Sequence, residues 1–351
     1  MDGSFASETR LEVLDLRPAI QRILDIQADG GAIPWFENGP WDPWNHVESA
    51  MALSVAGEYE AAERAFDFLV EHQREDGAWL GEYGNALPMA NRDYISREPA
   101  PAVLDSNFCA YPAVGIAHYL KLTGNVERVR TWWPMVERAL DFVIALQRDD
   151  GSICWCAEAL GTDEEDALLA GNASIFKSLE CGLYLARELG HTCDHWAHAR
   201  TKLLGALRSD PAAFDRRGHG ERFAMDWYYP VLSHALLPAD AYARILERCE
   251  TFVANEGCRC VSDEPWITTA ETAELIRALI TIGESDRAER LFDRLSDLRD
   301  KTGAFWMGWQ SEEQIYWPKE RPGWTQAAVV LAADALMRST PACRVLVAPL
   351  L

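Results

Sequence analysis

The sequence predicts an all-α protein, an (α/α)6 toroid in which six outer helices alternate with six inner ones. Two observations lead to this prediction. A helix–turn–helix pattern repeats along nearly the whole chain, and the helices before and after each turn differ in composition. No alternating strand pattern competes with the helical one. We therefore expect residues 1–351 to form a single domain.

The repeat consists of a helical stretch, a polar turn with glycine, an aromatic residue and a second helix. Its clearest copies span 27–35, 73–79 and 147–155, and each runs from a glutamine through a glycine to a tryptophan. Because glycine readily adopts the left-handed conformation that ends helices, we expect it at the C-cap of each outer helix. Weaker copies lie at 214–227, 255–266 and 301–306.

The two kinds of helix differ in where their charges lie. Before the turns, apolar residues such as Ala62, Phe66 and Leu69 recur at helical spacing, with charged residues on the other faces, as in a partly solvated outer helix. The segments after the turns carry few Lys or Arg residues, which predicts buried inner helices. These segments are 44–53, 105–114, 172–183, 226–232, 266–275 and 324–331, with predicted N-caps at Asp42, Asp105, Asn172 and Asp226.

Composition excludes several classes of partner. The formal net charge is −22 with scattered Lys and Arg, so a polyanion such as nucleic acid would be repelled. No apolar stretch approaches the ~18 residues of a membrane span, and the N-terminal sequence lacks the pattern of a signal peptide. We expect a cytoplasmic protein with no membrane partner. The C-x-C spacing of Cys154/Cys156 and Cys258/Cys260 is not that of a zinc or redox site, so we expect no metal or cofactor.

The connections that lead into the inner helices should converge at one end of the toroid, and they hold most of the 14 tryptophans. Aromatic rings stack on pyranose faces, and neighbouring carboxyl and amide groups bind hydroxyls, so we expect a carbohydrate site there. The alternative is that these residues only cap helices and fill the ring. The predicted substrate-binding residues are Trp41, Trp44, His46, Glu48, Asp105, Asn107, Tyr111, Asp226, Trp227, Tyr228, Trp266, Glu271, Trp309, Trp324 and Gln326.

Glycoside hydrolysis requires a protonated and an ionised carboxyl group. Asp42 and Glu264 each precede a Pro-Trp pair at the start of an inner helix. A neighbouring tryptophan disfavours the charged form, as a general acid requires. We assign Glu264 as acid and Asp42 as base, although the sequence does not order them. Competing carboxyls are Asp105, Asp226, Glu48 and Glu271. We expect His46, one helical turn beyond Asp42, to be a hydrogen-bonding partner or a core histidine, with a role as base as the alternative.

The glutamine-to-tryptophan copies resemble the repeats of squalene cyclases and protein prenyltransferases, which share the toroid. Their chemical motifs do not match, because the acidic run 163–166 is not Asp-x-Asp-Asp and no Asp/Cys/His zinc set is visible. The stretches Trp41-Asp-Pro-Trp-Asn-His46 and Asp263-Glu-Pro-Trp266 are similar to the actinobacterial hydrolases of methylmannose polysaccharide, which are six-hairpin glycosidases. This resemblance implies endo-acting, inverting cleavage of α-1,4-mannosidic bonds by a carboxyl pair, without a metal.

We therefore predict a cytoplasmic glycoside hydrolase that cleaves an α-mannosidic polysaccharide or oligosaccharide. Three alternatives remain: a terpenoid cyclase or prenyltransferase-like protein, a sugar epimerase on the same toroid, and a non-catalytic binding protein. An epimerase would need histidines on opposite sides of the sugar. A terpenoid enzyme would need a deep, dry aromatic pocket. The sugar, its methylation, the stereochemical course and the oligomeric state stay open.

Overall fold

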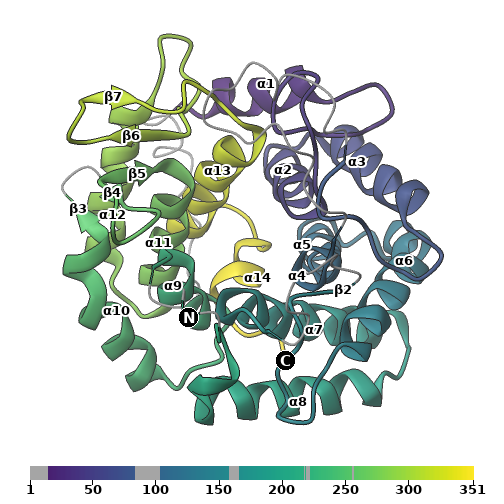
Figure 1. The fold of residues 1–351 in the computed structure, drawn as a ribbon. Helices are drawn as coiled ribbons and strands as arrows, with labels where there is room; N and C mark the ends of the chain where they lie inside the picture. Colours follow the sequence, from purple (N-terminus) through teal and green to yellow (C-terminus); the bar gives the residue numbers. More distant parts are fainter. Residues whose placement is uncertain (1–14, 84–102, 158–165, 217, 219–221, 255–256) are drawn as a thin grey trace, which may run out of the picture.

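The computed structural model describes residues 15–83, 103–157, 166–216, 218, 222–254 and 257–351. The predicted all-α toroid is confirmed: in the described part of the chain, six helices form a closed inner ring and six more surround it (Figure 1). None of the described helices combines the length and the apolarity needed to cross a membrane.

The inner ring closes because each helix contacts the next and the last returns to the first. The predicted segments overlap these helices, with two differences. Residues 266–268 form a strand before the fifth inner helix, and the second hairpin begins with a separate short helix, α4 (Ser106–Ala110), ahead of Pro112. In ring order the inner helices are α2 (Pro43–Val55), α5 (Pro112–Thr123), α7 (Leu169–Leu189), α9 (Ala224–Leu232), α11 (Thr269–Thr281) and α13 (Gly323–Met337).

The outer helices bury one face against this ring, as the amphipathic pattern predicts. Ala62, Phe66 and Leu69 are fully buried, and the charged faces are turned outward. The short helix α14 (Cys343–Val347) contacts α5, α11 and α13 and covers one end of the ring. The outer helices are α1 (Arg17–Ile26), α3 (Tyr59–His72), α6 (Val126–Ala145), α8 (Asp194–Ser209), α10 (Pro238–Phe252) and α12 (Ser285–Arg294), with 3-10 turns η2 (Pro211–Ala213) and η3 (Leu295–Leu298).

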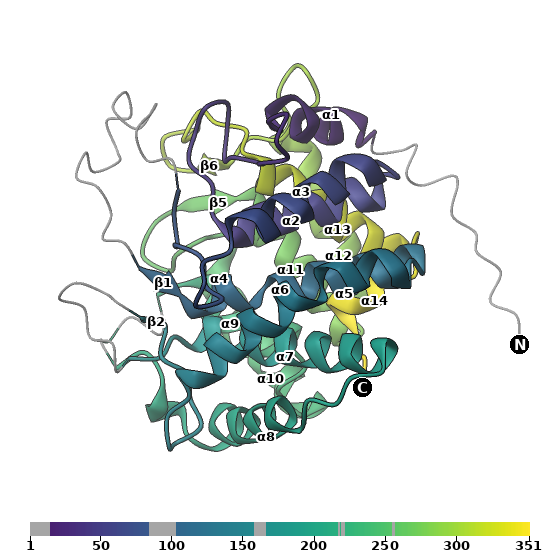
Figure 2. The ribbon, with the colours of Figure 1, turned by 90° about the vertical axis from the view of Figure 1, so that its right-hand side faces the viewer.

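At the other end, which we call the mouth, the inner helices begin and short antiparallel strands form its edge (Figures 1 and 2). In the three-stranded sheet, Trp266 lies opposite Gln310, and Trp309 lies opposite Tyr316. The strand pairs among the described residues are β1 (Leu104–Asp105) with β2 (Cys156–Ala157), β3 (Val253–Ala254) with β4 (Gly257–Cys258), and β5 (Trp266–Thr268) with β6 (Gly308–Gln310) and β7 (Ile315–Tyr316).

The three clear copies of the repeat share one hydrogen-bond pattern. The side-chain Nε2 of Gln73 donates to the carbonyl oxygen of Gly77 at 2.8 Å and to that of Met135 on the next outer helix at 2.9 Å. Gln27 and Gln147 make the equivalent two bonds across their own turns. The repeated glutamine therefore ties each turn to the adjacent hairpin.

The repeated glycine lies in the turn and does not cap the helix, so that expectation was wrong. Helix α3 ends at His72 with Gln73 as its C-cap, and Gly77 follows four residues after Gln73 with φ +88°. A Cβ atom at Gly77 would also collide with the backbone carbonyl of Arg138. Both the left-handed backbone and the close approach of α6 therefore require glycine here.

Side chains of the inner hairpin segments hold these turns from the inside. Each accepts a hydrogen bond from a backbone N–H just after the glycine. The donor and acceptor pairs are Ile33 with His46, Trp79 with Cys109, Ile153 with Asn172, Cys258 with Thr272, and Phe305 with Gln326. Asp42 and Asp105 cap their helices as predicted, but Asn172 and Asp226 lie inside α7 and α9, so their capping role was wrong.

Candidate active site

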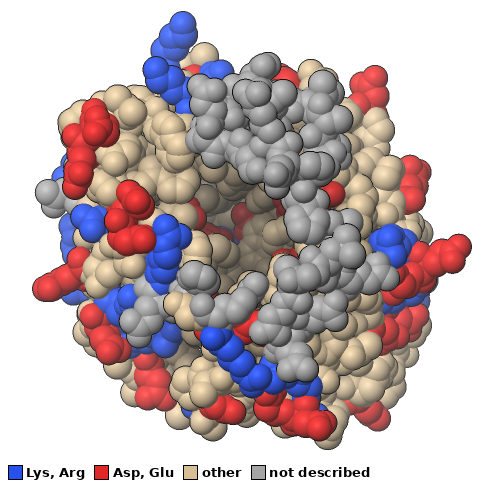
Figure 3. All heavy atoms as spheres, viewed as in Figure 1, with Lys and Arg blue, Asp and Glu red and all other residues tan. Residues whose placement is uncertain are grey.

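A depression opens at the centre of the mouth, and acidic side chains are visible inside it (Figure 3). The indole of Trp44 on α2 stacks on the phenol ring of Tyr111, with ring centroids 4.0 Å apart and 11° between the planes. Tyr229 of α9 lies beside them, with its ring centroid 5.7 Å from that of Trp44. Helices from three hairpins thus place aromatic rings together inside the ring.

A buried charge network joins this aromatic group. The hydroxyl of Tyr111 donates to Glu48 at 3.0 Å, and the guanidinium of Arg277 lies 3.7 Å from Glu48 and 3.3 Å from Glu274. Burial raises the pKa of both carboxyl groups, and the Arg277 charge opposes that rise. Tyr229 donates to Glu274 at 2.5 Å. Two acids therefore share one arginine inside the ring.

Glu274 and Arg277 were missed in the sequence, as was Tyr229. The sequence did contain a signal for a charged group on α11. Glu271, Glu274 and Arg277 follow one another at three-residue steps, which places two acids and an arginine near one another on the helix. The predicted inner segment 266–275 includes both acids, and charged residues in a buried helix are rare unless they are paired. Tyr228, which was predicted to bind substrate, donates a hydrogen bond from its hydroxyl to Glu274.

A cavity of about 230 Å³ lies at the mouth, beside the starts of α4, α7 and α9. Asp105 and Asp226 both border it, and burial raises the pKa of each carboxyl to about 7. The charge of Asp42 further raises the pKa of Asp105. Asn107 also borders this cavity, and its buried Oδ1 has no hydrogen-bond partner within the described residues. A polar ligand would satisfy that atom.

Asp42 is completely buried. Its Oδ2 accepts hydrogen bonds from Trp35 Nε1 and Asn45 Nδ2, both at 2.6 Å, and its Oδ1 accepts one from the Asn45 backbone at 2.9 Å. Burial raises its pKa to about 6. The residue is thus fixed in the wall next to Asp105, with three donors on its two oxygens.

The other predicted acids lie in the fifth hairpin. Glu264 is exposed in the loop between β4 and β5, next to Asp263, which pairs with Arg222 at 2.9 Å. Glu271 lies in the first turn of α11 and accepts a hydrogen bond from the hydroxyl of Thr268. In the acidic run 163–166, Asp166 is buried and accepts backbone hydrogen bonds, while 163–165 lie outside the described residues.

Three predicted binding residues have structural roles instead. His46 accepts from the Ile33 backbone through Nδ1 at 3.0 Å and donates to Ala65 through Nε2 at 2.9 Å. Gln326 is fully buried, and its side-chain amide accepts a hydrogen bond from the backbone N–H of Phe305 and donates one to the carbonyl oxygen of Phe305. Trp41 is buried and stacks on Tyr83 with ring centroids 4.2 Å apart. These side chains hold the wall of the site.

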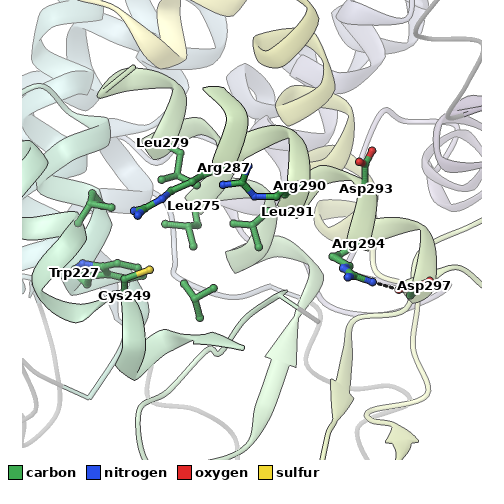
Figure 4. A pocket seen from close by; sticks show the side chains of 12 residues that line it. Trp227, Cys249, Leu275, Leu279, Arg287, Arg290, Leu291, Asp293, Arg294 and Asp297 are labelled. Carbon is green, nitrogen blue, oxygen red and sulfur yellow. Dashed lines mark ion pairs between the residues drawn. The ribbon is translucent and has the colours of Figure 1, made fainter. Parts of the chain in front are cut away.

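Trp227 does not belong to the mouth. Its side chain lies in the floor of a separate cavity of about 630 Å³ in the outer wall between α10 and α12 (Figure 4). Its indole N–H donates to the carbonyl oxygen of Arg244 on α10 at 2.7 Å. The sequence placed Trp227 correctly near the start of an inner helix, but consecutive residues of a helix point in different directions.

The remaining predicted aromatics lie at the edge of the mouth. Trp324, in the first turn of α13, makes an edge contact with Trp35, with ring centroids 5.6 Å apart. Trp266 and Trp309 lie in the three-stranded sheet between the fifth and sixth hairpins. Among the described residues, neither this sheet nor α13 contributes to the lining of the 230 Å³ cavity.

Comparison with known proteins identifies the family. No protein-family model matches the chain. It is 44% identical over 326 residues to the MMP endo-(1,4)-3-O-methyl-alpha-D-mannosidase of Mycolicibacterium hassiacum, covering 93% of this chain and 87% of that protein. The chain belongs to the family of this mannosidase. It is accordingly a glycoside hydrolase, which excludes the terpenoid and epimerase alternatives as its main activity.

Solved structures share the fold of this hydrolase. A wild-type glycosidase matches with a TM-score of 0.71 at 14% identity, covering 95% of this chain and 99% of that one. The GH63 mannosylglycerate hydrolase of Thermus thermophilus matches with a TM-score of 0.67 at 13% identity, over 92% and 99% of the two chains. Within the described residues of the hydrolase, no group of three or more His, Cys, Asp or Glu is arranged to hold a metal ion.

Proposed function

We propose that the chain is an endo-acting α-mannosidase that cleaves internal 1,4-linkages of a 3-O-methylated mannose polysaccharide. The observation that supports this most is the 44% identity to the mannosidase of that substrate, over 93% of the chain. The mouth is suited to such a polymer, because aromatic rings contact the apolar faces and methyl ethers of the sugars while carboxyl groups bind their remaining hydroxyls.

The hydrolysis requires a proton donor for the leaving oxygen and a carboxylate that activates water. The pair predicted from the sequence is Asp42 and Glu264. The structure favours a third carboxyl, Asp105, as proton donor, since it borders the cavity and its pKa is raised to about 7. Such a group is substantially protonated at neutral pH and can still release its proton. In this proposal Asp42 supplies a charge that raises the pKa of Asp105, and Glu264, which the sequence analysis assigns as the acid, serves as base.

The test is cleavage of the methylmannose polysaccharide by wild type, Asp42→Asn, Asp105→Asn and Glu264→Gln, with products analysed by mass spectrometry. Asp105→Asn and Glu264→Gln should each lose at least about 100-fold in kcat, because general acid–base catalysis contributes about 10²–10⁴-fold. Asp334→Asn is the control, because Asp334 is a buried acid that binds Thr340 far along α13. Full activity of Asp105→Asn would reject the proton-donor assignment and leave the pair Asp42 and Glu264.

Inversion of the anomeric configuration is part of the proposal. It requires room for a water molecule between the two carboxyl groups, and NMR of the first product formed distinguishes it from retention. The cytoplasmic location expected from the sequence also stays a prediction, which cell fractionation tests.

A further inference from the structure

The sheet β5–β6–β7 has two faces of different character. Side chains of cross-strand partners share a face, so Trp266, Gln310 and Ile315 line one side. The opposite side carries Trp309 and Tyr316, which pack on the core. The first side is more open: Ile315 is 45% exposed, and the neighbouring Trp317 is 37% exposed.

The aromatic side chains on this open face are held in place. The indole N–H of Trp266 donates to the carbonyl oxygen of Trp317 at 2.7 Å, and the two rings meet edge to face with centroids 5.4 Å apart. Gly308 lies directly against the Trp266 ring, where a Cβ atom would come within 2.6 Å of Nε1. The backbone N–H of Trp317 in turn donates to the carbonyl oxygen of Gly308 at 3.0 Å. Little conformational entropy would be lost when a ligand contacts rings that are already fixed.

The position of this sheet links it to the mouth. β5 ends at Thr268, and α11 begins at the next residue, while β7 is followed by the segment that leads to Gly323 at the start of α13 (Figure 1). The sheet therefore stands at the N-terminal ends of two neighbouring inner helices, which border the mouth. A polymer chain that leaves the mouth on this side would pass the sheet.

We propose that Trp266, Ile315, Trp317 and Gln310 form a secondary carbohydrate-binding surface, which holds sugar units of the polymer outside the cleavage site. This inference rests on the proposed function and specifies where the remainder of a long substrate binds. The exposed ring of Trp317 and the part-buried ring of Trp266 beside it suit the apolar faces of methylated pyranoses. The Nε2 amide of Gln310 makes no hydrogen bond within the described residues, so it can donate to a sugar hydroxyl.

Charge favours a neutral polymer over other partners of this surface. Glu312 and Glu313 follow Gln310 in the hairpin turn, and their backbone N–H groups both donate to the Gln310 side-chain oxygen at 2.9 Å. Both side chains are exposed in this turn, two and three residues before Ile315, where carboxylates repel polyanions and can accept hydrogen bonds from sugar hydroxyls. A polysaccharide without charge fits this combination.

The test compares a long with a short substrate. The double variant Ile315→Ser, Trp317→Ala removes the two most exposed apolar side chains of the surface. The matched control is Leu237→Ser, Tyr59→Ala, which removes two exposed apolar side chains (53% and 43% exposed) at the starts of outer helices α10 and α3. We expect KM for the full polysaccharide to rise about 3- to 10-fold in the first variant, with kcat unchanged, because one ring contact contributes about 0.5–1.5 kcal/mol.

Hydrolysis of a tetrasaccharide, the short substrate, should be the same in wild type, variant and control. Equal KM values on the polysaccharide, or an equal loss on both substrates at unchanged unfolding temperature, would overturn the binding surface. If the wild type cleaves neither substrate, the proposed function is wrong, but the binding surface is still testable. Affinity electrophoresis in gels that contain the polysaccharide then decides: retardation of wild type and control but not of the variant supports the surface, and equal mobility rejects it.

Discussion

Trp44 and Tyr111 stack face to face between the first and second hairpins, and the hydroxyl of Tyr111 reaches Glu48, one helical turn after Trp44 on the same helix. The aromatic rings and the buried acids are therefore parts of one unit. A change to either residue alters both the packing and the charge distribution of the site.

Tyr111→Phe keeps the stacked ring but removes the hydrogen bond to Glu48. We expect a loss of about 1–3 kcal/mol in the free energy of unfolding, since a buried carboxyl group loses its donor. Chemical denaturation measures this loss. Tyr184→Phe is the control, because Tyr184 is also buried and its ring contacts are to Lys121 and Arg187. A loss of similar size in the control would contradict the role of the Glu48 bond.

Arg277→Met leaves Glu48 and Glu274 buried without their shared positive charge. Breaking a buried pair in this way costs about 3–5 kcal/mol, and the variant is expected to unfold at much lower denaturant concentration. Arg130→Met provides the comparison, because Arg130 forms an exposed pair with Glu127 at 4.0 Å. Such pairs contribute about 0–1 kcal/mol. Similar stability of the two variants would show that Arg277 does not hold the acids together.

Gly77→Ala tests the role of the repeated glycine. Gly57 has a similar backbone, with φ +83° against +88° for Gly77, but no atom lies within 4 Å of the position of its Cβ. Gly57→Ala should therefore cost only the left-handed conformation, about 1–2 kcal/mol. Gly77→Ala should cost about 1–3 kcal/mol more, because α6 must move away. Thermal unfolding of both variants measures the difference, and equal losses would show that the contact with Arg138 is unimportant.

The pH dependence tests the state of Asp105. If its protonated form donates the proton, kcat/KM of the wild type falls as pH rises through about 7, the pKa of this carboxyl. Its pKa is higher in the folded than in the unfolded chain, so its contribution to stability is also lost between about pH 4 and pH 7. Asp105→Asn should remove both effects, whereas Asp334→Asn should keep the activity profile. An unchanged profile in Asp105→Asn would assign the ionisation to another group.

The repeat made most of the fold predictable. Gln27, Gln73 and Gln147 recur with a glycine four residues later because each copy makes the same two bonds, so three hairpins could be recognised from the sequence by this pattern. The capping role assigned to these glycines was wrong, since periodicity does not show which hydrogen bonds close a turn. The strand at Trp266–Thr268 was missed because its partners, residues 308–310, are distant in sequence.

The site was less predictable than the fold. The sequence placed Trp44, Glu48, Asp105 and Tyr111 at the mouth but could not separate residues that face the depression from residues that face the wall. His46 and Gln326 carry the same polar groups as binding residues, yet their partners are backbone atoms of their own hairpins. The pairing of Arg277 with both Glu274 and Glu48 depends on closure of the ring. Only then does Glu48 of α2 come close to Arg277 of α11.

The most direct test of the proposed activity is a time course of wild-type enzyme with end-labelled methylmannose polysaccharide, analysed by mass spectrometry. We expect internal fragments of several lengths at the earliest times, with little free monosaccharide. We also expect slower cleavage of an unmethylated α-1,4-mannan. Release of single sugars from one end, or no cleavage of either polymer by folded protein, would contradict the assignment of an endo-acting α-mannosidase.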